Sequence, residues 1–443
     1  MEFVVLGAFV VQLVALVALG LPVWTPLAVG LVLFWGYGLV RGHAPAALAR
    51  MTATGIKTAA GVLESFVLIG ILTALWRASG TISQIVVMTA GLVGPTTIPV
   101  ASFLLCGLVS YLMGGSFATA ATMGVVCGTM ASAMGANLVL VGGAILSGCY
   151  FGDRCSPVSS SALLVRTVTG TKLRENLVGM MRTAAVPLAL ALVVYVAAGV
   201  LAPAEGLAGS ELVESLTSAY GYRPVTLLPA VAILVMPLAG MGMKRSMAIS
   251  SAIAALVCLL VRGDGIVELL GWCLLGYSCP DASLATLMSG GGIVSMVSVS
   301  AVVCLSSSYA GIFDGTGLLD GVRSHVAAIA RRFGPFVAVL AVGIPASMIA
   351  CNQTLAIMLT SQLCEGVEPD AQSLAIDLEN GPVVISPLIP WSIAGTTIMT
   401  LAHAPLLGIL AAVYLWLIPV CHLISKSQKF FANHACKVRG ASV

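Results

Sequence analysis

The sequence predicts an all-α integral membrane protein with about 11–13 spans, arranged in two inverted repeats with broken helices and re-entrant hairpins. Three observations support this fold class. The 443-residue chain is 59% hydrophobic and only 8% charged, whereas roughly a quarter of an average soluble domain is charged. Its long apolar runs match the length of membrane-spanning helices. Several unusual features also recur in the same order in the two halves.

Long apolar runs account for the predicted spans. A helix needs about 20 apolar residues to cross a bilayer core, and two of the runs are long enough for two spans. The runs lie near 3–20, 22–40, 59–77, 98–113, 117–152, 177–201, 224–240, 246–261, 266–310, 334–350, 381–402 and 404–424. Shorter apolar pieces around 82–93 and 353–364 suit broken or re-entrant elements. Irregular backbone survives at membrane depth only beside protein or a water-filled cavity, so these pieces indicate a solute pathway.

The order of these runs suggests five regions. We expect N-terminal spans in 1–50, a first transport repeat in 51–205, connecting spans in 206–265, a second repeat in 266–425 and a basic cytoplasmic tail in 426–443. Short cytoplasmic loops are enriched in Lys and Arg, which places 41–57, 244–245 and the tail inside. The acid-rich connections 205–214 and 365–379 fit the outside. A simple span count also puts the basic segment 323–332 outside, so one element near 291–364 is re-entrant or miscounted.

Composition and motifs exclude several other classes. A net charge of +3 is too small to indicate a nucleic-acid partner. None of the twelve cysteines has the CxxC spacing of a metal or redox site. A lipid-active membrane enzyme is disfavoured because the chain has no HExxH motif, no GxSxG motif and no clustered histidines. We therefore expect no enzyme activity and no cofactor.

The two halves share a sequence of landmarks. Gly80-Thr81, Gly114-Gly115-Ser116 and Ser156-Pro157 are followed, roughly 230 residues later, by Gly315-Thr316, Cys351-Asn352-Gln353 and Ser386-Pro387. Internal duplication with broken helices in corresponding positions is typical of secondary transporters, whose sites lie at the repeat interface near the membrane midplane. We therefore expect Gly115 and Asn352 to approach each other.

The two interruptions provide oxygen ligands. Ser116 and Thr119 follow the first break, and Asn352 and Gln353 form the second. Sodium and similar cations bind such hard oxygens. The alternative is packing, because small residues let membrane helices approach closely and Ser or Thr can bond to the preceding turn.

The segment from Gly148 to Ser161 is the richest in polar groups. Asp153 at the end of an apolar span could bind a cation or carry a proton, and Arg154 could pair with it. Four hydroxyl side chains follow, those of Ser156, Ser159, Ser160 and Ser161. The alternative is an interfacial Asp-Arg pair that caps a helix and anchors a loop.

Two further features complete the set of candidates. Residues 380–392 include Ser386, Ser392 and three prolines, which forbid a continuous helix. Glu64 lies inside an apolar run, and an ionisable group there is a candidate proton carrier. Its alternative is snorkelling toward Lys57 or Arg77.

The motifs resemble one known family. Tyr150-Phe-Gly-Asp-Arg-Cys-Ser-Pro-Val-Ser159, Ala350-Cys-Asn-Gln-Thr-Leu-Ala-Ile357 and Ser386-Pro-Leu-Ile-Pro-Trp391 are similar to motifs of the NhaC-type sodium/proton antiporters, within the ion transporter superfamily. Arg77-Ala-Ser-Gly-Thr81 and Val168-Thr-Gly-Thr-Lys172 also fit, and the likeness runs from about residue 55 to 425. It implies a duplicated fold of inverted repeats with re-entrant hairpins, and an electrogenic exchange of sodium for protons.

The sequence departs from the family at both presumed site motifs. Where the family typically continues Ser-Asp-Thr-Thr-Asn, this chain has Ser159-Ser160-Ser161-Ala162-Leu163. Where the family typically has Trp-Asn-Thr, the chain has Trp391-Ser392-Ile393. Both halves thus lose polar groups beside the presumed site, while Asp153 remains.

Together these features predict a secondary active transporter of a bacterial-type inner (plasma) membrane that exchanges Na+ for H+ by alternating access. Asp153 would bind either a cation or protons, with Ser116, Asn352 and free carbonyls completing the cation shell. The alternative is a cation-coupled symporter of a small organic acid or amino acid, whose carboxylate would bind at half-helix N-termini. The expected partners are the lipid bilayer and the transported solute, and the oligomeric state stays open, with a homodimer included.

Overall fold

The computed structural model describes residues 2–89, 93–202, 209–221, 223–281, 284–316, 323–368 and 370–440. These residues form helices and connecting loops, with no β-strand and a single isolated bridge between Tyr277 and Gly290. The all-α class predicted from the sequence is confirmed for this part of the chain. The predicted boundary between the first repeat and the connecting spans, at 205 and 206, lies outside the described residues.

The first half of the chain contains long apolar helices interrupted by short ones. Its elements are α1 (Glu2–Ala18), α2 (Trp24–Val40), α3 (Pro45–Thr58), α4 (Ala60–Ala78), α5 (Thr81–Thr89), α6 (Ile98–Met113), α7 (Ser116–Thr119), η1 (Ala120–Gly124), α8 (Val125–Ala133), α9 (Leu138–Cys155), α10 (Ser160–Thr169), α11 (Leu173–Leu201) and α12 (Gly209–Tyr220). The predicted short element around 82–93 corresponds to α5, which has 9 residues.

The second half shows the same alternation of long and short helices. Its elements are η2 (Pro224–Leu227), α13 (Leu228–Leu238), α14 (Met243–Val257), η3 (Cys258–Arg262), α15 (Ile266–Leu275), α16 (Ala285–Met288), η4 (Ile293–Met296), α17 (Val297–Thr316), α18 (Arg323–Phe333), α19 (Pro335–Ala350), α20 (Gln353–Leu363), α21 (Ala371–Asn380), α22 (Pro382–Ile385), η6 (Ser386–Leu388), α23 (Ile393–Leu401), η7 (Leu406–Ala411) and α24 (Val413–Gly440). The predicted short element around 353–364 corresponds to α20, with 11 residues.

Several helices are long and apolar enough to cross a membrane. Among the described residues there are 5 by length and composition, or up to 7 if two bent helix pairs each count as one span. The single helices are Ala60–Ala78, Leu138–Cys155, Leu173–Leu201, Met243–Arg262 and Ile293–Phe313, and the pairs join Glu214–Tyr220 to Pro224–Pro237 and Ala371–Leu388 to Ile393–Leu401. Other apolar helices have 10–17 residues. The protein is therefore a multi-pass membrane protein, and a total of about 11–13 spans stays a prediction.

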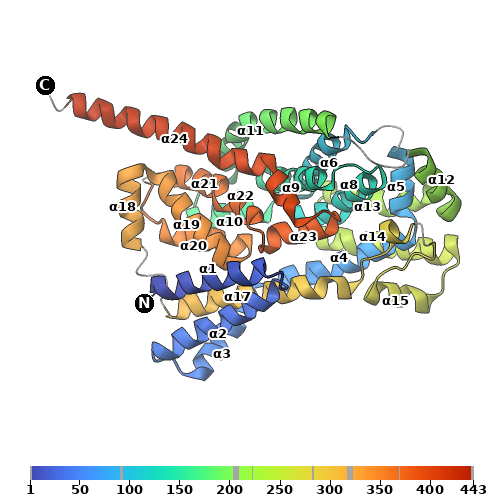
Figure 1. The fold of residues 1–443 in the computed structure, drawn as a ribbon, viewed down its shortest axis with the longest axis horizontal. Helices are drawn as coiled ribbons and strands as arrows, with labels where there is room; N and C mark the ends of the chain where they lie inside the picture. The colour runs from blue at the N-terminus through green and yellow to red at the C-terminus, as the bar shows by residue number, and fades with distance from the viewer. Residues whose placement is uncertain are drawn as a thin grey trace.

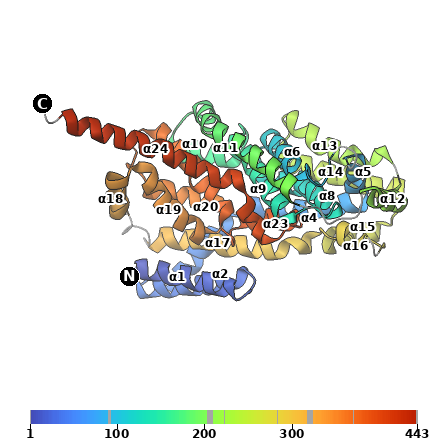
Figure 2. The same cartoon turned by 45° about the horizontal axis from the view of Figure 1, so that its top comes forward.

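The helices form one elongated bundle (Figure 1). Helix α17 runs along it and contacts α2 and α3, while α1 and α2 lie together as an outer layer beside α17 (Figure 2). Helices α6 and α9 pack along each other at the centre. Glycine allows α6 and α9 to approach this closely, because a Cβ on Gly152 of α9 would lie 2.3 Å from the Tyr111 nitrogen of α6. The pair holds the end of α9, where Asp153 lies, in a fixed place.

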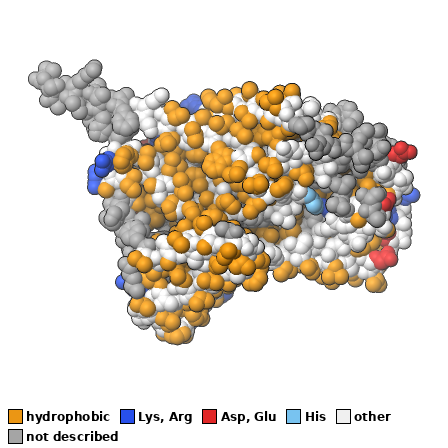
Figure 3. Space-filling view, in the orientation of Figure 1, with side chains coloured by type: hydrophobic (Ala, Val, Ile, Leu, Met, Phe, Trp, Pro, Cys, Tyr) orange, Lys and Arg blue, Asp and Glu red, His pale blue; other side chains and the backbone are white. Residues whose placement is uncertain are grey.

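The surface of the bundle is suited to lipid along its length and to water at its ends. Hydrophobic side chains cover most of the face in Figure 3, Lys and Arg gather at the end where α18 lies, and the acidic side chains seen there lie at the opposite end. Helix α18, with Arg331 and Arg332 in its last turn, shares its end of the molecule with the C-terminal part of α24 (Figure 1). The side of the membrane on which the basic segment 323–332 lies stays a prediction.

Candidate functional site

Glycine breaks the first of two interrupted helices. Helix α6 ends at Met113, Gly114 takes the left-handed conformation (φ 69°, ψ 28°), and Gly115 is extended (φ −153°, ψ 120°) before α7 begins at Ser116. A side chain at Gly114 would be strained by this φ, and its Cβ would also lie 2.5 Å from Val158. The break therefore requires glycine, and it turns the N-terminus of the following helix toward the middle of the molecule.

The second interrupted helix repeats the same succession of conformations without glycine. Helix α19 ends at Ala350, Cys351 is left-handed (φ 55°, ψ 7°), and Asn352 is extended (φ −145°, ψ 151°) before α20 begins at Gln353. The Asn352 Oδ1 caps α20 by accepting the Leu355 N–H at 2.9 Å. A left-handed non-glycine residue costs of order 1–3 kcal/mol and tends to occur at functional sites.

A third pair of matching features follows the breaks. Ser159 caps the N-terminus of α10 and Ser392 caps that of α23. Each also reaches back six residues, because the Ser159 hydroxyl donates to Asp153 Oδ1 at 2.9 Å and the Ser386 and Ser392 hydroxyls lie 3.4 Å apart. Ser386 thus takes the place of Asp153 in the second half, and not that of Ser156 as the sequence landmarks suggested. The Gly80 and Gly315 landmarks do not match, since Gly80 follows α4 with φ +79° and Gly315 lies inside α17.

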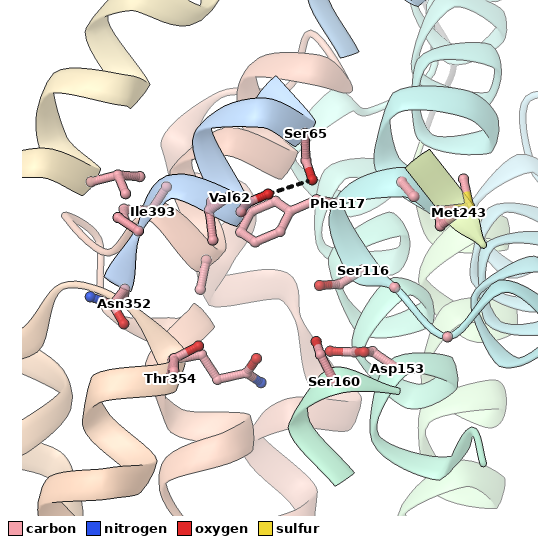
Figure 4. A pocket seen from close by; sticks show the side chains of 18 of the residues that line it. Val62, Ser65, Ser116, Phe117, Asp153, Ser160, Met243, Asn352, Thr354 and Ile393 are labelled. Atoms are coloured by element: carbon pink, nitrogen blue, oxygen red, sulfur yellow. Dashed lines mark hydrogen bonds between the residues drawn. The ribbon is translucent and has the colours of Figure 1, made fainter. Parts of the chain in front are cut away.

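The two breaks line one partly open cavity of about 760 Å³. From the first half come Ser116, Asp153 and Ser160, and from the second half Asn352 and Gln353. Figure 4 shows Ser116, Asp153 and Ser160 facing Asn352 and Thr354 across this cavity. Gly115 and Asn352 therefore line the same cavity, and their approach near the membrane midplane stays a prediction.

Asp153 is the acidic side chain at this cavity, yet it is only 2% exposed. It lies in the last turn of α9, and Ser159, its hydrogen-bond donor, is in turn 2.8 Å from the Ser161 hydroxyl. Hydroxyl and carboxylate oxygens gathered in this way are the ligands that small hard cations prefer. A buried carboxylate needs either a proton or a cation to offset its charge, so Asp153 is suited to exchange one for the other.

Arg154 does not pair with Asp153, which corrects the expected Asp-Arg pair. It is fully buried, and its guanidinium donates to the Glu379 carbonyl at 3.2 Å, the Thr183 hydroxyl at 2.8 Å and the Asn380 Oδ1. It also donates to the Tyr414 hydroxyl at 3.4 Å. Arg154 therefore joins α9 to α11, α21 and α24 behind Asp153, with neutral oxygens as partners.

Glu379 is a buried acid that the sequence analysis placed in an outer connection. Its side chain is 0% exposed, so the interpretation of 365–379 as an outer loop is wrong at this residue. Neither of its carboxylate oxygens has a hydrogen-bond partner among the described residues, and the same holds for Nδ2 of the adjacent Asn380. One sequence signal could have identified Glu379 and Asn380 as candidate site residues. They lie directly before Gly381 and Pro382, at the start of a proline-rich run.

Several predicted residues lie away from the cavity. The Thr119 hydroxyl bonds to the Gly115 carbonyl of its own helix, and Ser156 accepts the Val158 N–H. Ser386 and Ser392 are buried beside the second break, where Ser392 donates to the Cys351 carbonyl at 3.2 Å. Glu64 is exposed and paired with Lys244 at 2.6 Å. The expected partners of Glu64, Lys57 and Arg77, are thus replaced by Lys244, which itself lines the cavity.

Two interrupted helices and a buried carboxylate meet at one cavity of this helical membrane protein. This arrangement is typical of secondary active transporters. The relatives show that the protein is an antiporter. The chain belongs to the Na+/H+ antiporter family, whose model matches residues 148–425, more than half of its length. The resemblance to NhaC-type antiporters is thereby confirmed.

The relatives include antiporters of different solutes. The chain is 26% identical to the "Arginine/ornithine antiporter ArcD" of Halobacterium salinarum, over 90% of this chain and 84% of that protein. It is 24% identical to the "Malate-2H(+)/Na(+)-lactate antiporter" of Bacillus subtilis, over 88% and 86%. It is also 24% identical to the "Na(+)/H(+) antiporter NhaC" of Bacillus subtilis, over 80% of each chain.

Proposed function

We propose that this antiporter exchanges sodium ions for protons across a bacterial-type inner membrane, with Asp153 binding either a sodium ion or a proton. The observation that carries the proposal is the burial of Asp153 at the wall of the shared cavity, with the Ser159 hydroxyl 2.9 Å away. The Na+/H+ antiporter relatives support the choice of ions.

Competition at one carboxylate couples the two fluxes. A sodium ion at Asp153 would take its ligands from the carboxylate and from nearby oxygens such as that of Ser116. A proton on Asp153 removes the negative charge that holds the ion. The unloaded site carries a buried charge whose desolvation is expensive, so the transporter changes its accessible side mainly with one or the other bound.

The matching breaks favour two inverted repeats that move relative to each other during transport. A common origin of the two halves is supported by the similar backbone conformations at Gly114-Gly115 and Cys351-Asn352. It is also supported by the hydroxyl contacts that Ser159 and Ser392 each make with the residue six positions earlier. In transporters built from such repeats, one repeat rocks against the other about a site near the midplane. The short helices α7 and α20 would then form parts of re-entrant hairpins.

Purified protein in liposomes tests the proposal. An outward sodium gradient should drive proton entry in the wild type, and Asp153→Asn should abolish this exchange because the amide cannot titrate. The control Glu175→Gln removes an exposed acid of the Lys172 pair and should exchange normally. Size-exclusion profiles of both variants should match the wild type. Wild-type exchange in the Asp153→Asn protein would contradict the assigned role.

Organic-solute exchange is a second candidate, favoured by the cavity itself. A volume of about 760 Å³ is far larger than one sodium ion needs, and Lys244, Asn352 and Gln353 add donors to its wall. These groups suit a solute with a carboxylate, such as an amino acid or a hydroxy acid. Adding such solutes to the same liposomes separates the candidates, because solute-driven proton flux without a sodium response would favour this one.

A further inference from the structure

Glu379 is a buried acid that exchange at Asp153 alone does not use. It occupies the last turn of α21, its side chain is 0% exposed, and neither carboxylate oxygen has a hydrogen-bond partner among the described residues. Buried acids in proteins are nearly always hydrogen-bonded, so an exception asks for an explanation. The Nδ2 atom of the adjacent Asn380 also has no hydrogen-bond partner among the described residues. Two neighbouring buried polar side chains therefore lack hydrogen bonds.

Arg154 connects Glu379 to the cavity residue. It follows Asp153 directly in α9, and its guanidinium lies 3.2 Å from the Glu379 carbonyl oxygen. Arg154 donates to the Glu379 carbonyl and not to its carboxylate. The Glu379 carboxyl is thus buried next to a buried cation, without a hydrogen-bond partner among the described residues. An ionisable group buried in this way in a membrane protein is a candidate for a proton relay.

The other charged groups on neighbouring elements are engaged elsewhere. Helices α19, α20 and α22 carry no charged side chain. Asp377 of α21 is bonded to His422 and Lys426 of α24, and Lys426 also binds Glu368. The charged side chains of α10 and α11, which pack on α21, are exposed and comprise Arg166, Arg174, Glu175 and Arg182.

We propose that Glu379 is a second proton-carrying residue, so that the exchange moves two protons for each sodium ion. This rests on the proposed function, because sodium still binds at Asp153. With both acids protonated, the buried group of Asp153, Glu379 and Arg154 has one positive charge. With both acids ionised and one sodium ion bound, it is neutral. Each carboxylate takes one proton from one side of the membrane and releases it to the other, so every cycle moves one net charge.

Substitution of Glu379 changes this charge count. Glu379→Gln makes this side chain permanently neutral, so the proton-loaded and sodium-loaded states both carry one positive charge and the exchange becomes electroneutral. Glu379→Asp keeps a titratable carboxylate and should keep the wild-type ratio. A residue that only supports the fold would affect the rate in both variants and leave the ratio unchanged.

The experiment uses full-length protein in liposomes with an imposed potassium diffusion potential. Sodium uptake and proton flux are measured together, and we expect potential-dependent exchange for the wild type and Glu379→Asp. For Glu379→Gln we expect potential-independent exchange, with the proton-to-sodium ratio halved. An unchanged ratio in Glu379→Gln, or an electroneutral wild type, would overturn the role of Glu379 while leaving sodium/proton exchange at Asp153 intact. Absence of any sodium-driven proton flux in the wild type would instead overturn the proposed function.

Proton release in detergent provides a measurement that does not need transport. Sodium binding to weakly buffered wild-type protein should release two protons per bound ion, read with a pH dye, and Glu379→Gln should release half as many. If Glu379→Gln fails to fold, the wild type decides the question, because release of only one proton per sodium ion refutes a second carrier.

Discussion

Ser160 lies where an added charge affects sodium and a carboxylate-bearing solute in opposite ways. It lines the cavity beside Asp153 and is exposed to it. Ser160→Asp adds a negative charge near the cation site, so the apparent KM for sodium should fall about tenfold, which corresponds to about 1.4 kcal/mol. Initial rates of sodium-driven proton flux measure this change.

The neutral control for this substitution is Ser160→Asn, which has the same shape without the charge. If the chain instead transports an organic acid, Ser160→Asp should abolish uptake of that solute, because like charges repel in the cavity. Loss of solute uptake with no change in the sodium response would reject sodium/proton exchange.

Glu64 belongs to an exposed ion pair, and we expect its removal to have little effect. The side chains of Lys244 and Glu64 are 45% and 66% exposed, and such pairs contribute about 0–1 kcal/mol. Glu64→Gln should therefore keep the wild-type exchange rate within about twofold. Loss of proton-coupled transport in Glu64→Gln, measured beside Asp153→Asn, would restore Glu64 as a proton carrier.

At the scale of elements, the α6–α9 contact depends on small residues. A Cβ on Gly152 would lie 2.3 Å from the Tyr111 nitrogen and 2.6 Å from the Gly107 carbonyl oxygen. Both are backbone atoms of α6, which cannot rotate away as a side chain can. Gly152→Ala should force the helices apart, lower stability by about 1–3 kcal/mol and reduce transport, because Asp153 is the next residue. Thermal unfolding in detergent measures the first effect.

Gly36→Ala in α2 is the matched control. Nothing lies within 4 Å of the added Cβ, so alanine there should leave stability unchanged or raise it by about 0.5–1 kcal/mol. Equal melting temperatures for the two variants would show that the α6–α9 contact tolerates a methyl group.

Lys426 joins helix α24 to α21 and to the segment after α20, next to the contact between His422 and Asp377. Lys426 lies 2.7 Å from Glu368 and 3.1 Å from Asp377. Burial lowers the pKa of Lys426, but attraction to Asp377 and Glu368 outweighs burial and the net shift is upward. A raised lysine pKa means that its contribution to stability is complete below about pH 10.4 and is lost as the pH rises through the shifted value.

Lys426→Met should therefore destabilise the protein by about 3 kcal/mol at neutral pH, because Asp377 is 0% exposed and loses one of its partners. The difference from the wild type should shrink above about pH 10.4. Melting curves at a series of pH values check both points, and a constant difference at all of them would contradict this role of the charge.

At the scale of the whole molecule, the charge distribution predicts orientation. The exposed Arg331 and Arg332 of α18 share one end of the bundle with the C-terminal part of α24 (Figure 1), and basic segments face the cytoplasm. Arg331→Cys should add labelling by an impermeant maleimide in inside-out vesicles, compared with the wild type. Additional labelling in right-side-out vesicles would reverse the orientation.

The breaks in the helices were predictable because they follow from local chemistry. The pair Gly114-Gly115 weakens a helix, although the pair Gly142-Gly143 lies inside α9 without a break, and Asn352 prefers a helix cap to a helix interior. The partners of the polar groups were not predictable in this way. Arg154 bonds to Asn380, 226 residues away in sequence, and no local pattern indicates which of its neighbours it will meet.

The sequence by itself determined that this is a helical membrane protein with two matching interruptions, and that Asp153 is the acid beside them. It could do so because burial preference and helix breaking are properties of short segments. Only the tertiary structure decided that Ser159 and not Ser156 bonds to Asp153, that Ser386 occupies the equivalent position, and that Glu379 is buried behind Arg154. Those contacts join segments that are far apart in the chain, and they depend on how whole helices pack.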